Sequence, residues 1–438
     1  MLILRASCLC GSGAGSGEMI IGKINWRGQE KLFGIHAPDR RRHAYVLGQS
    51  GVGKTTLLEN MAAQDAENNN GFCLIDPHGQ LAEAVLDRIP SHRYNQTIYF
   101  DPTDDWPISL NVLESGDPEF KDLVASHIVS LFKSIWGEEL VGPRSEDLLR
   151  NTVFALMGVQ GATLLWIPRL LVEKEFREEI VSKVQNPIIK KFWVEEYDKY
   201  DQRFQNEVIA PLQNKLRSFL SFQKVRDVVA QPYRKVSMRQ VIDSGQILIC
   251  NLSKGLIGED NASLLASLIA EELFLSALSR ANVPEDQRRP FYLYIDESQT
   301  ITGSVLAPML SEARKYALAL TISHQYIQQL PPEITQAIFG NVGTIITFRL
   351  GASDSLHIEK EFSGMFRAPD FENLPVHHAY IRLSVDGMTS DPFSMTTLPP
   401  PLSRPSNRES IIKTSRQRFG TSREFVEEKI KTWLTNPV

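Results

Sequence analysis

The sequence predicts an α/β fold in which a mainly parallel central sheet is covered by helices and is interrupted by an inserted all-α domain. Short apolar runs alternate with helical stretches near the start of the chain and again after Gln246, which is the pattern of a parallel sheet. From about residue 116 to 240 the pattern changes to long helical stretches, as expected of an insertion. The 438 residues are enough for two or three folding units.

The composition is that of an ordinary soluble globular protein. Hydrophobic residues make up 42% of the chain and charged residues 23%, which argues against wholesale disorder. The formal net charge of -5 argues against coating nucleic acid by bulk electrostatics, so any DNA contact must be local. The four cysteines fit neither zinc spacing nor a disulfide framework. With no run of about 18 apolar residues expected to span a bilayer, a cytoplasmic location is predicted.

The strands and helices are expected in a regular order. A hairpin from Met19 to Ile35, turning at Arg27-Gly28, leads to a strand from His43 to Leu47. Further strands are predicted at Gly71 to Ile75, Thr97 to Phe100, Ile247 to Asn251, Phe291 to Ile295, Leu318 to Ser323 and Gly343 to Phe348. Helices are predicted at Thr55 to Asn68, Asp260 to Ala281 and Leu306 to Tyr316. Tyr380 to Leu383 and Asp391 to Met395 predict a last hairpin.

The domain boundaries follow from these elements and from changes in composition. Three prolines from Pro399 to Pro401 end the α/β pattern, and a Ser/Arg-rich tether up to Arg423 is expected to lead to a final amphipathic helix, Glu424 to Leu434. The predicted division is a flexible segment 1–17, a first part of the α/β domain 18–115, an all-α insertion 116–240, a second part 241–398, and a tether with its helix 399–438.

Aromatic residues are concentrated in one part of the helical insertion, from Pro187 to Leu220. They stand among many charged residues and include Phe192, Trp193, Tyr197, Tyr200 and Phe204. They form either a surface for a partner or the core-facing side of packed helices, and helical spacing favours the core interpretation.

A glycine-rich loop with the spacing of a phosphate-binding site lies between the first long strand and helix. Its residues are Gly48, Gln49, Ser50, Gly51, Val52, Gly53, Lys54 and Thr55, followed by Thr56. Backbone N-H groups of such a loop and the dipole of the next helix surround phosphates closely, which requires glycine. Lys54 is expected to reach the β- and γ-phosphates of ATP, and the Thr55 hydroxyl to ligate Mg²⁺. A chance match on a turn is the alternative.

Two carboxylates follow the apolar strand that ends at Ile295. Asp296 is expected to hold Mg²⁺ through its hydration shell, and Glu297 to polarise the attacking water as general base. An acidic pair at the end of a strand is often only solvated. Together with the phosphate loop, however, the pair predicts hydrolysis of ATP.

Other polar residues follow neighbouring strands at the same expected edge of the sheet. Asp76 ends the strand after the loop, and there it either orients water or metal or caps its own Asp-Pro turn. Gln325 is expected to sense the γ-phosphate and position water, whereas His324 is not expected to act as a base. Arg217, Arg314 and Arg349 are candidates for an arginine that neutralises transition-state charge, with a salt bridge or a solvated position as the alternative for each.

Several short motifs, in this order, resemble one family. They are the phosphate loop, Asp76-Pro77-His78-Gly79, Asn251-Leu252-Ser253-Lys254-Gly255, Ile295-Asp296-Glu297, Arg314-Lys315-Tyr316, Ser323-His324-Gln325 and Gly340-Asn341-Val342-Gly343-Thr344. The set resembles the conjugative coupling-protein ATPases of type IV secretion, within the wider clade of FtsK- and HerA-like DNA pumps, over roughly residues 20 to 398.

The resemblance implies a RecA-like P-loop domain with an all-α insertion, assembled as a homo-hexamer around DNA, with ATP between subunits. Its implied partners are DNA in the pore, a type IV secretion channel and a relaxase-type protein. In the family the motor carries amino-terminal membrane helices; this sequence shows no span of its own, and recruitment to the inner face of the membrane is the expectation. Candidate residues for the pore are Arg40 to Arg42, Lys215, Arg217, Lys224, Arg226, Arg234 and Lys235, with scattered solvated charges as the alternative.

Three functions remain open at this point. The first is an ATP-driven DNA translocase, which the ordered motifs favour. The second is a secretion or pilus motor acting on protein substrates, for which the aromatic helices from 187 to 220 would recognise a polypeptide. The third is a nucleotide-switched scaffold without turnover, against which the intact Glu297 beside Asp296 argues.

Overall fold

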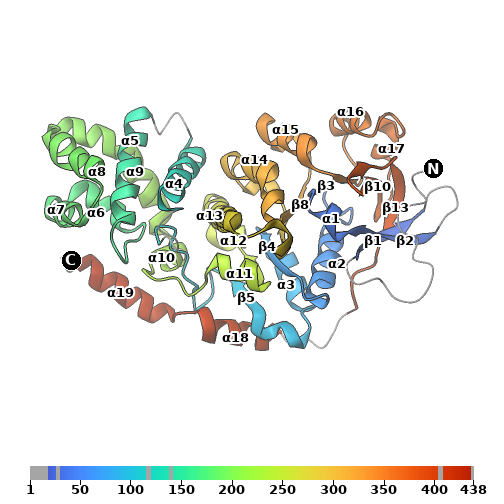
Figure 1. The fold of residues 1–438 in the computed structure, drawn as a ribbon, viewed down its shortest axis with the longest axis horizontal. Coiled ribbons are helices and arrows are strands. Elements are labelled where there is room, and N and C mark those ends of the chain that lie inside the picture. The colour runs from blue at the N-terminus through green and yellow to red at the C-terminus, as the bar shows by residue number, and fades with distance from the viewer. Residues whose placement is uncertain (1–17, 26–29, 115–119, 138–141, 403–407, 436–438) are drawn as a thin grey trace. The chain divides into compact units, whose positions relative to one another are not determined.

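A large mixed sheet runs through one part of the chain in the computed structural model, which describes residues 18–25, 30–114, 120–137, 142–402 and 408–435 (Figure 1). The strands of this sheet among the described residues are β1 Glu18–Ile24, β2 Lys31–His36, β3 Ala44–Leu47, β4 Gly71–Asp76, β5 Thr97–Phe100, β6 Ile247–Asn251, β7 Phe291–Ile295, β8 Leu318–His324, β9 Thr344–Thr347, β10 His378–Arg382 and β13 Phe393–Thr397. Their order across the sheet is β2-β1-β13-β10-β9-β3-β8-β7-β4-β6-β5.

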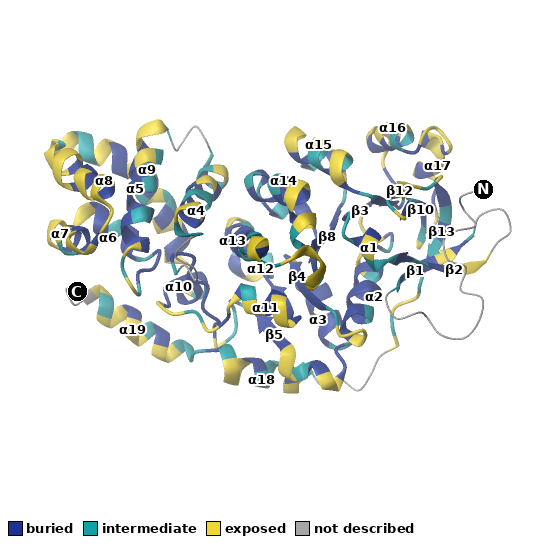
Figure 2. Cartoon of the chain, in the orientation of Figure 1, coloured by how far each residue is buried: buried dark blue, intermediate teal, exposed yellow. Residues whose placement is uncertain are grey.

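The middle of the sheet is parallel. Strands β9, β3, β8, β7, β4 and β6 pair with their neighbours in parallel register. Every residue of β3, β4, β6, β7, β8 and β9 is buried, as Figure 2 shows for the labelled central strands. Strands that are covered on both faces appear in the sequence as continuous apolar runs, and such runs are easy to recognise. The bounds of β5, β6 and β7 are accordingly those predicted from the sequence.

One side of the sheet ends in antiparallel strands. β1 pairs with β2 and β13, and β10 pairs with β13 and β9. Burial alternates along β10 and β13, as it does in strands with one covered face. A short hairpin of β11 Ser384–Val385 and β12 Met388–Thr389 lies between β10 and β13 along the chain and turns at Asp386-Gly387. The predicted hairpins are therefore present, although Arg27-Gly28 lies outside the described residues.

The chain folds into two compact units. The sheet unit comprises the described residues up to Tyr99 together with Arg239–Asn251 and Ser276–Thr414, and the helical unit comprises Phe100–Met238, Leu252–Leu275 and the residues from Ser415 onward. The helical unit thus also includes two segments beyond the predicted insertion, and the boundaries at 116 and 240 stay predictions.

The helices of the sheet unit are mostly short. They are α1 Ala37–Arg40, α2 Lys54–Glu67, α3 Gln80–Leu86, α11 Met238–Ser244, α14 Gly303–Glu312, α15 Pro332–Asn341, α16 Ala352–Glu361 and α17 Ala368–Glu372, with 3₁₀ turns at Ser91–Gln96, Ser279–Asn282, Glu285–Gln287, Ser298–Thr300, Ala313–Tyr316 and Ile327–Gln329. Apolar residues of α2 and α3 pack with the sheet in one core cluster. On β3, the Tyr45 ring contacts Phe339 of α15 at a centroid distance of 5.8 Å.

The helices of the helical unit are α4 Lys121–Trp136, α5 Pro143–Met157, α6 Trp166–Val172, α7 Lys174–Lys183, α8 Pro187–Lys191, α9 Gln202–Ser221, α10 Gln223–Val229, α12 Lys254–Ile257, α13 Glu259–Leu278 and α19 Arg423–Thr435, with a π-helical turn at Phe192–Glu196 and a 3₁₀ turn at Tyr197–Lys199. α13 ends in the sheet unit. The segment Glu259–Asn282 is long and apolar enough to cross a membrane by length and composition, contrary to the expectation from sequence, but 72% of its apolar window is buried, as in the core helix of a globular protein.

The predicted tether before Arg423 is wrong in one part. Residues Arg408–Phe419 form helix α18. Ile411 of this helix is fully buried in the core of the sheet unit, and Arg408 forms ion pairs with Glu83 at 3.0 Å and Asp87 at 2.7 Å. A single buried apolar residue in a charged segment gives little helical periodicity, so the sequence pattern did not reveal this anchor.

A buried ion pair connects α1 and α2 to the sheet. Arg40 donates two hydrogen bonds of 2.8 Å to the two carboxylate oxygens of Asp65, and a third to the hydroxyl of Tyr294 on β7. The Tyr294 hydroxyl itself donates to Asp65. The Arg40 guanidinium also lies 3.5 Å from the ring centroid of Tyr292. Arg40 is 7% exposed, so its predicted role in lining a DNA pore is wrong.

We predict that Asp65→Ala destabilises the protein by about 3–5 kcal/mol, because it leaves the buried Arg40 charge without its carboxylate. Urea denaturation followed by circular dichroism measures this loss. The double variant Arg40→Met/Asp65→Leu should lose less, since no charge remains unpaired, and the exposed Glu372→Ala is the control. Equal stability of Asp65→Ala and wild type would contradict the role of this ion pair.

Candidate active site

The carboxyl ends of three neighbouring parallel strands bring the predicted catalytic residues together. β8 lies between β3 and β7, with Leu47 paired to His324 and Ile295 paired to Ile322. Because the strands are parallel and in this register, the residues that follow them lie at one edge of the sheet. The phosphate loop, the acidic pair and Gln325 therefore share this edge.

The phosphate loop has backbone geometry that requires glycine. Gly51 and Gly53 have φ angles of +76° and +117°. A Cβ on Gly48 would lie 2.6 Å from the Cβ of Phe348, whereas a Cβ on Gly51 would meet no atom within 4 Å. The loop is thus tightly packed at its base and open at Gly51, where a phosphate has room to approach.

Neighbouring segments hold the loop in place through backbone hydrogen bonds. The N-H of Gly48 donates to the carbonyl of His324 at 3.3 Å, and the N-H of Gln49 donates to the carbonyl of Arg349 at 3.0 Å. From the other side, the N-H of His377 donates to the carbonyl of Val52 at 2.9 Å. The loop is a rigid part of the sheet edge.

Lys54 lies buried under the loop. Its Nζ donates to the carbonyl oxygens of Gly48 at 2.7 Å and Gln49 at 2.9 Å, and the residue is 6% exposed. Burial lowers the pKa of Lys54, opposed by the charges of Glu297 and Asp296. A charged amine that has lost its water is strongly stabilised by hydrogen bonds to phosphate oxygens. Thr55 is exposed in the first turn of α2, where the backbone N-H groups also have no helical acceptor.

Asp296 is a buried carboxylate. It is 7% exposed, and its Oδ1 accepts a hydrogen bond of 2.5 Å from the hydroxyl of Ser323 on β8. Burial raises the pKa of Asp296; the bond from Ser323 opposes this, and the nearby carboxylates Asp76 and Glu297 add to it. A nearby divalent cation would stabilise the ionised form of such a carboxylate. The surroundings of Asp296 are therefore those of a metal ligand.

Glu297 is held between two amides. Its Oε1 accepts a hydrogen bond of 2.8 Å from Nε2 of Gln325, and its Oε2 accepts one of 2.6 Å from Nε2 of Gln299. The residue has a left-handed backbone, with φ +50°, and is 7% exposed. Such a backbone in a non-glycine residue is uncommon and occurs at functional sites. Both bonds orient the carboxylate as an acceptor, which suits a base.

Gln299 is the residue that the sequence analysis missed. It stands two residues after Glu297, in the 3₁₀ turn Ser298–Thr300, and its amide contacts the carboxylate oxygen that Gln325 leaves free. An amide shortly after an acidic pair is a weak signal by itself. Only the left-handed turn at Glu297 folds it back onto the carboxylate.

Asp76 and His324 have structural roles in this edge. Oδ1 of Asp76 accepts from the N-H of His78 at 2.8 Å, and Oδ2 accepts from the N-H of Ala82 at 2.9 Å. These bonds favour the interpretation of Asp76 as a cap of its own turn and of α3. His324 is fully buried beside the hydroxyl of Tyr45, and burial followed by the charge of Lys54 lowers its pKa to about 3. An imidazole with so low a pKa accepts a proton poorly, so His324 does not suit the role of general base.

The residues at this edge fit Mg²⁺ bound together with a nucleotide. The described residues contain no group of three or more His, Cys, Asp or Glu side chains that could hold a metal ion alone. Mg²⁺ is usually held by one or two protein oxygens, phosphates and water, so Asp296 and the Thr55 hydroxyl suffice. A pocket of about 390 Å³ lined by Gln49, Ser50, Gln325 and Gly351, among others, adjoins the loop.

The three candidate arginines lie in different places. Arg349 follows β9 and offers its carbonyl to the phosphate loop. Arg217 is an exposed residue of α9 in the helical unit. Arg314 lies in the turn Ala313–Tyr316, which precedes β8. Just after this turn, the carbonyl of Ala317 accepts a hydrogen bond from the N-H of Phe291, the first residue of β7. Arg314 is therefore at the amino ends of the strands, on the edge opposite the phosphate loop.

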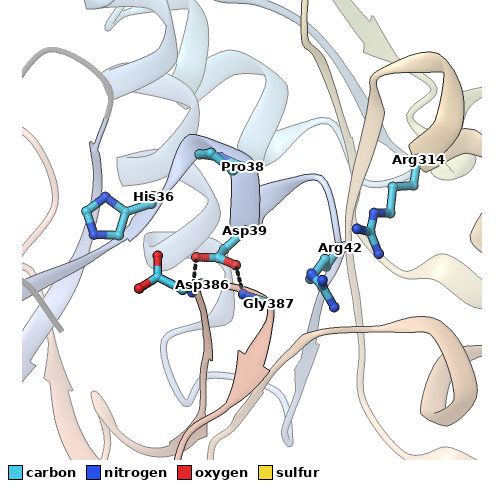
Figure 3. A pocket seen from close by; sticks show the side chains of 7 residues that line it. All are labelled: His36, Pro38, Asp39, Arg42, Arg314, Asp386 and Gly387. Atoms are coloured by element: carbon cyan, nitrogen blue, oxygen red, sulfur yellow. Dashed lines mark hydrogen bonds between the residues drawn. The ribbon is translucent and has the colours of Figure 1, made fainter. Parts of the chain in front are cut away.

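At that opposite edge, Arg314 and Arg42 line one pocket of about 410 Å³ (Figure 3). Asp39 also lines it, but both of its carboxylate oxygens accept backbone bonds of 2.9 Å, from Asp386 and Gly387. The Arg42 guanidinium packs so closely on Gly387 that a Cβ there would lie 2.6 Å away from Nη2. From its place in the Arg40 to Arg42 run, Arg42 is expected only as a pore residue.

Several other basic residues that were expected to line a pore instead form hydrogen bonds or ion pairs within the chain. Arg234 pairs with Glu114 and Glu272, Lys235 donates to the carbonyl of Gly420, and Arg226 donates to the carbonyl of Leu220. Arg41, Lys215, Arg217 and Lys224 retain at least partial exposure. A DNA-contacting role for these four stays a prediction.

Comparisons with known proteins identify relatives of this chain. Residues 34–365 match the family described as Type IV secretion-system coupling protein DNA-binding domain. Similar solved structures include plasmid coupling protein TrwB in complex with ADP and Mg²⁺, with 16% identity, a TM-score of 0.64 and coverage of 89% of this chain and 97% of that chain. Another is VirB4 of Thermoanaerobacter pseudethanolicus, with 14% identity, a TM-score of 0.56 and coverage of 90% and 99%. These two likenesses confirm the predicted fold class. No curated protein matches the chain.

We predict that Glu297→Gln preserves nucleotide binding but lowers the rate of ATP hydrolysis by about 10²- to 10⁴-fold, because the amide cannot accept the proton of the attacking water. Steady-state phosphate release and equilibrium binding of a fluorescent ATP analogue measure the two effects separately. Unchanged turnover would remove Glu297 from the mechanism.

Lys54→Ala is the matched control, since it removes a charge from the same edge without removing the base. It should weaken nucleotide binding itself, because the amine faces the phosphates. If both variants lost binding to the same degree, the effect of Glu297→Gln would be structural rather than chemical.

Proposed function

Because its match over residues 34–365 places this chain in the family of type IV secretion-system coupling proteins, we propose that it hydrolyses ATP to drive DNA, or a DNA-protein complex, toward a type IV secretion or conjugation channel. The observation that carries the hydrolytic part is Glu297, held by Gln325 and Gln299 beside the phosphate loop. A nucleotide-switched scaffold has no need of so ordered a base.

Each residue of the site has a task in hydrolysis. The loop from Gly48 to Thr56 binds the phosphates, and Lys54 exchanges its carbonyl partners for phosphate oxygens. Asp296 and Thr55 would hold Mg²⁺, which would supply positive charge that neutralises the phosphates. Glu297 accepts a proton from the attacking water, and Gln325 positions that water or senses the γ-phosphate. Gln299 keeps the Glu297 carboxylate in place.

We further propose that the chain works as a homo-hexamer with DNA in the central pore. The support for a ring is the distribution of charge within one chain: the phosphate loop lies at the carboxyl ends of the strands, and the pocket of Arg42 and Arg314 lies at their amino ends. A subunit cannot bring Arg314 to its own phosphates without unfolding the sheet. In a ring, one subunit's arginines face the next subunit's nucleotide.

The expected partners follow from the family. DNA in the pore, a type IV secretion channel and a relaxase-type protein are the proposed partners, and recruitment of a cytoplasmic ring to the inner face of the membrane is the proposed location. The net charge of -5 supports local rather than general contact with DNA, through a few exposed basic side chains.

We predict that DNA stimulates ATP hydrolysis by the purified protein. The logarithm of the DNA affinity should fall with the logarithm of salt concentration, with a slope of about -0.9 for each phosphate neutralised on duplex DNA. Hydrolysis assays with single- and double-stranded DNA at several salt concentrations measure both. Stimulation by a partner protein and indifference to DNA would instead support a motor that acts on protein substrates.

We predict that Arg314→Ala and Arg42→Ala each abolish most turnover and that activity returns when either is mixed with Glu297→Gln. The two inactive chains complement each other only if the arginine acts on a neighbour's nucleotide. Phosphate release after subunit exchange measures this effect. Mixing Glu297→Gln with Lys54→Ala is the control and should restore nothing, since both residues serve the same nucleotide.

The same mixing experiment ranks the remaining candidates. Arg349→Ala should show no complementation, because Arg349 lies at the loop edge of its own chain. Arg217→Ala tests whether the helical unit supplies an arginine. Absence of complementation by all four arginine variants would refute supply from a neighbouring subunit.

A further inference from the structure

A surface pocket in the helical unit combines aromatic walls with two carboxylates. It has a volume of about 280 Å³ and lies between α5, the π-helical turn Phe192–Glu196 and α9. The residues used below are Arg144, Asp147, Phe192, Glu196, Tyr200 and Phe204. None of them belongs to the ATPase site.

The walls of the pocket are aromatic rings held by their neighbours. Tyr200 and Phe204 meet edge to face with ring centroids 4.7 Å apart, and Tyr200 also contacts Tyr197 at 5.6 Å. Phe192 is 8% exposed, whereas Tyr200 and Phe204 are partly open to solvent. Of the two interpretations of these aromatics from sequence, the core one holds for Trp193 and Tyr197, which are fully buried, but not for Tyr200 and Phe204.

Two carboxylates, Asp147 and Glu196, line the pocket. Within the described ranges, no ion pair joins Asp147 or Glu196 to a basic side chain, although the adjacent acids Glu146 and Glu195 pair with Lys133 and Lys191. Glu196 accepts a bond of 2.9 Å from the hydroxyl of Tyr200. Partial burial and then the charge of Glu196 raise the pKa of Asp147, and the charge of Arg150 and a hydrogen bond from Asn151 oppose this only in part. The two like charges thus disfavour each other, and a cation between them would relieve this.

The backbone at the pocket is also unusual. Phe192 to Glu196 form a π-helical turn that follows α8 directly. Such turns are rare because their hydrogen bonds are less favourable than those of an α-helix. Those that do occur are often found at functional sites. This one places both an aromatic wall and a carboxylate in the same pocket.

The chain itself shows that the aromatic wall accepts a guanidinium. The Arg144 side chain lies over the Phe204 ring, 5.2 Å from its centroid. It forms no ion pair with Asp147 or Glu196 among the described contacts, so it occupies one ring face without neutralising either carboxylate. Aromatic faces beside carboxylates are the chemistry by which proteins bind cationic side chains.

We propose that this pocket binds a lysine or arginine side chain of a partner polypeptide. The carboxylates repel DNA phosphates, which excludes nucleic acid from this spot, and the pocket has room for one long side chain rather than a folded surface. The site therefore gives the proposed DNA motor a separate means of recognising protein. It does not depend on hydrolysis of ATP.

Fluorescence anisotropy with a labelled hexapeptide that carries two arginines tests the proposal. The full-length protein should bind it at least about fivefold tighter than the same peptide with neutral citrulline in place of arginine. Asp147→Asn/Glu196→Gln should weaken binding by about tenfold, since it removes both counter-charges. Arg144→Gln should strengthen binding, because it removes a competing cation.

The control is Glu175→Gln/Glu178→Gln, which changes the net charge equally on exposed residues of the same unit outside the pocket. Retention of affinity in this control, with loss in the pocket variant, supports the proposal. Equal loss in both, or equal binding of the citrulline peptide, overturns it. ATP hydrolysis without peptide should be the same in every variant, so this result is separable from failure of the proposed motor function.

Discussion

The parallel register of β3, β8 and β7 is the constraint on which the rest of the site depends. It places the phosphate loop, Gln325 and the acidic pair at the ends of adjacent strands, with β8 between the other two. Fully buried strands cannot slip by one residue without turning their apolar side chains to the wrong face. Catalytic geometry is thereby fixed by the same burial that stabilises the sheet.

Burial of charge then sets the chemistry of this edge. Lys54, Asp296 and Glu297 are each less than a tenth exposed, and each finds protein partners in the absence of a phosphate. Below them, the Arg40–Asp65 pair bonds to Tyr294, two residues before Asp296. The strand that carries the acidic pair is therefore bound to the helix that follows the phosphate loop, and α2 and β7 form one rigid support.

The two edges of the sheet have opposite functions in the proposed ring. One edge carries the phosphate loop and the proposed base, and the other presents Arg42 and Arg314 in a pocket without the loop. This polarity follows from a parallel sheet, whose carboxyl ends lie on one side and amino ends on the other. The helical unit adds a third surface, whose carboxylates and aromatic rings suit a basic polypeptide rather than DNA.

The sequence by itself determined the fold class, and it predicted the phosphate loop, Asp296, Glu297 and Gln325, because each rests on a local pattern of apolar runs and spaced glycines or polar residues. Tertiary structure alone decided which distant residues meet: Gln299 at Glu297, Arg42 at Arg314, and the buried Ile411 that makes a helix of the expected tether. It also removed Arg40 from the candidate DNA surface by pairing it with Asp65. Local spacing encodes strands and loops, whereas contacts between remote side chains depend on sheet order and burial, which no single stretch of sequence specifies.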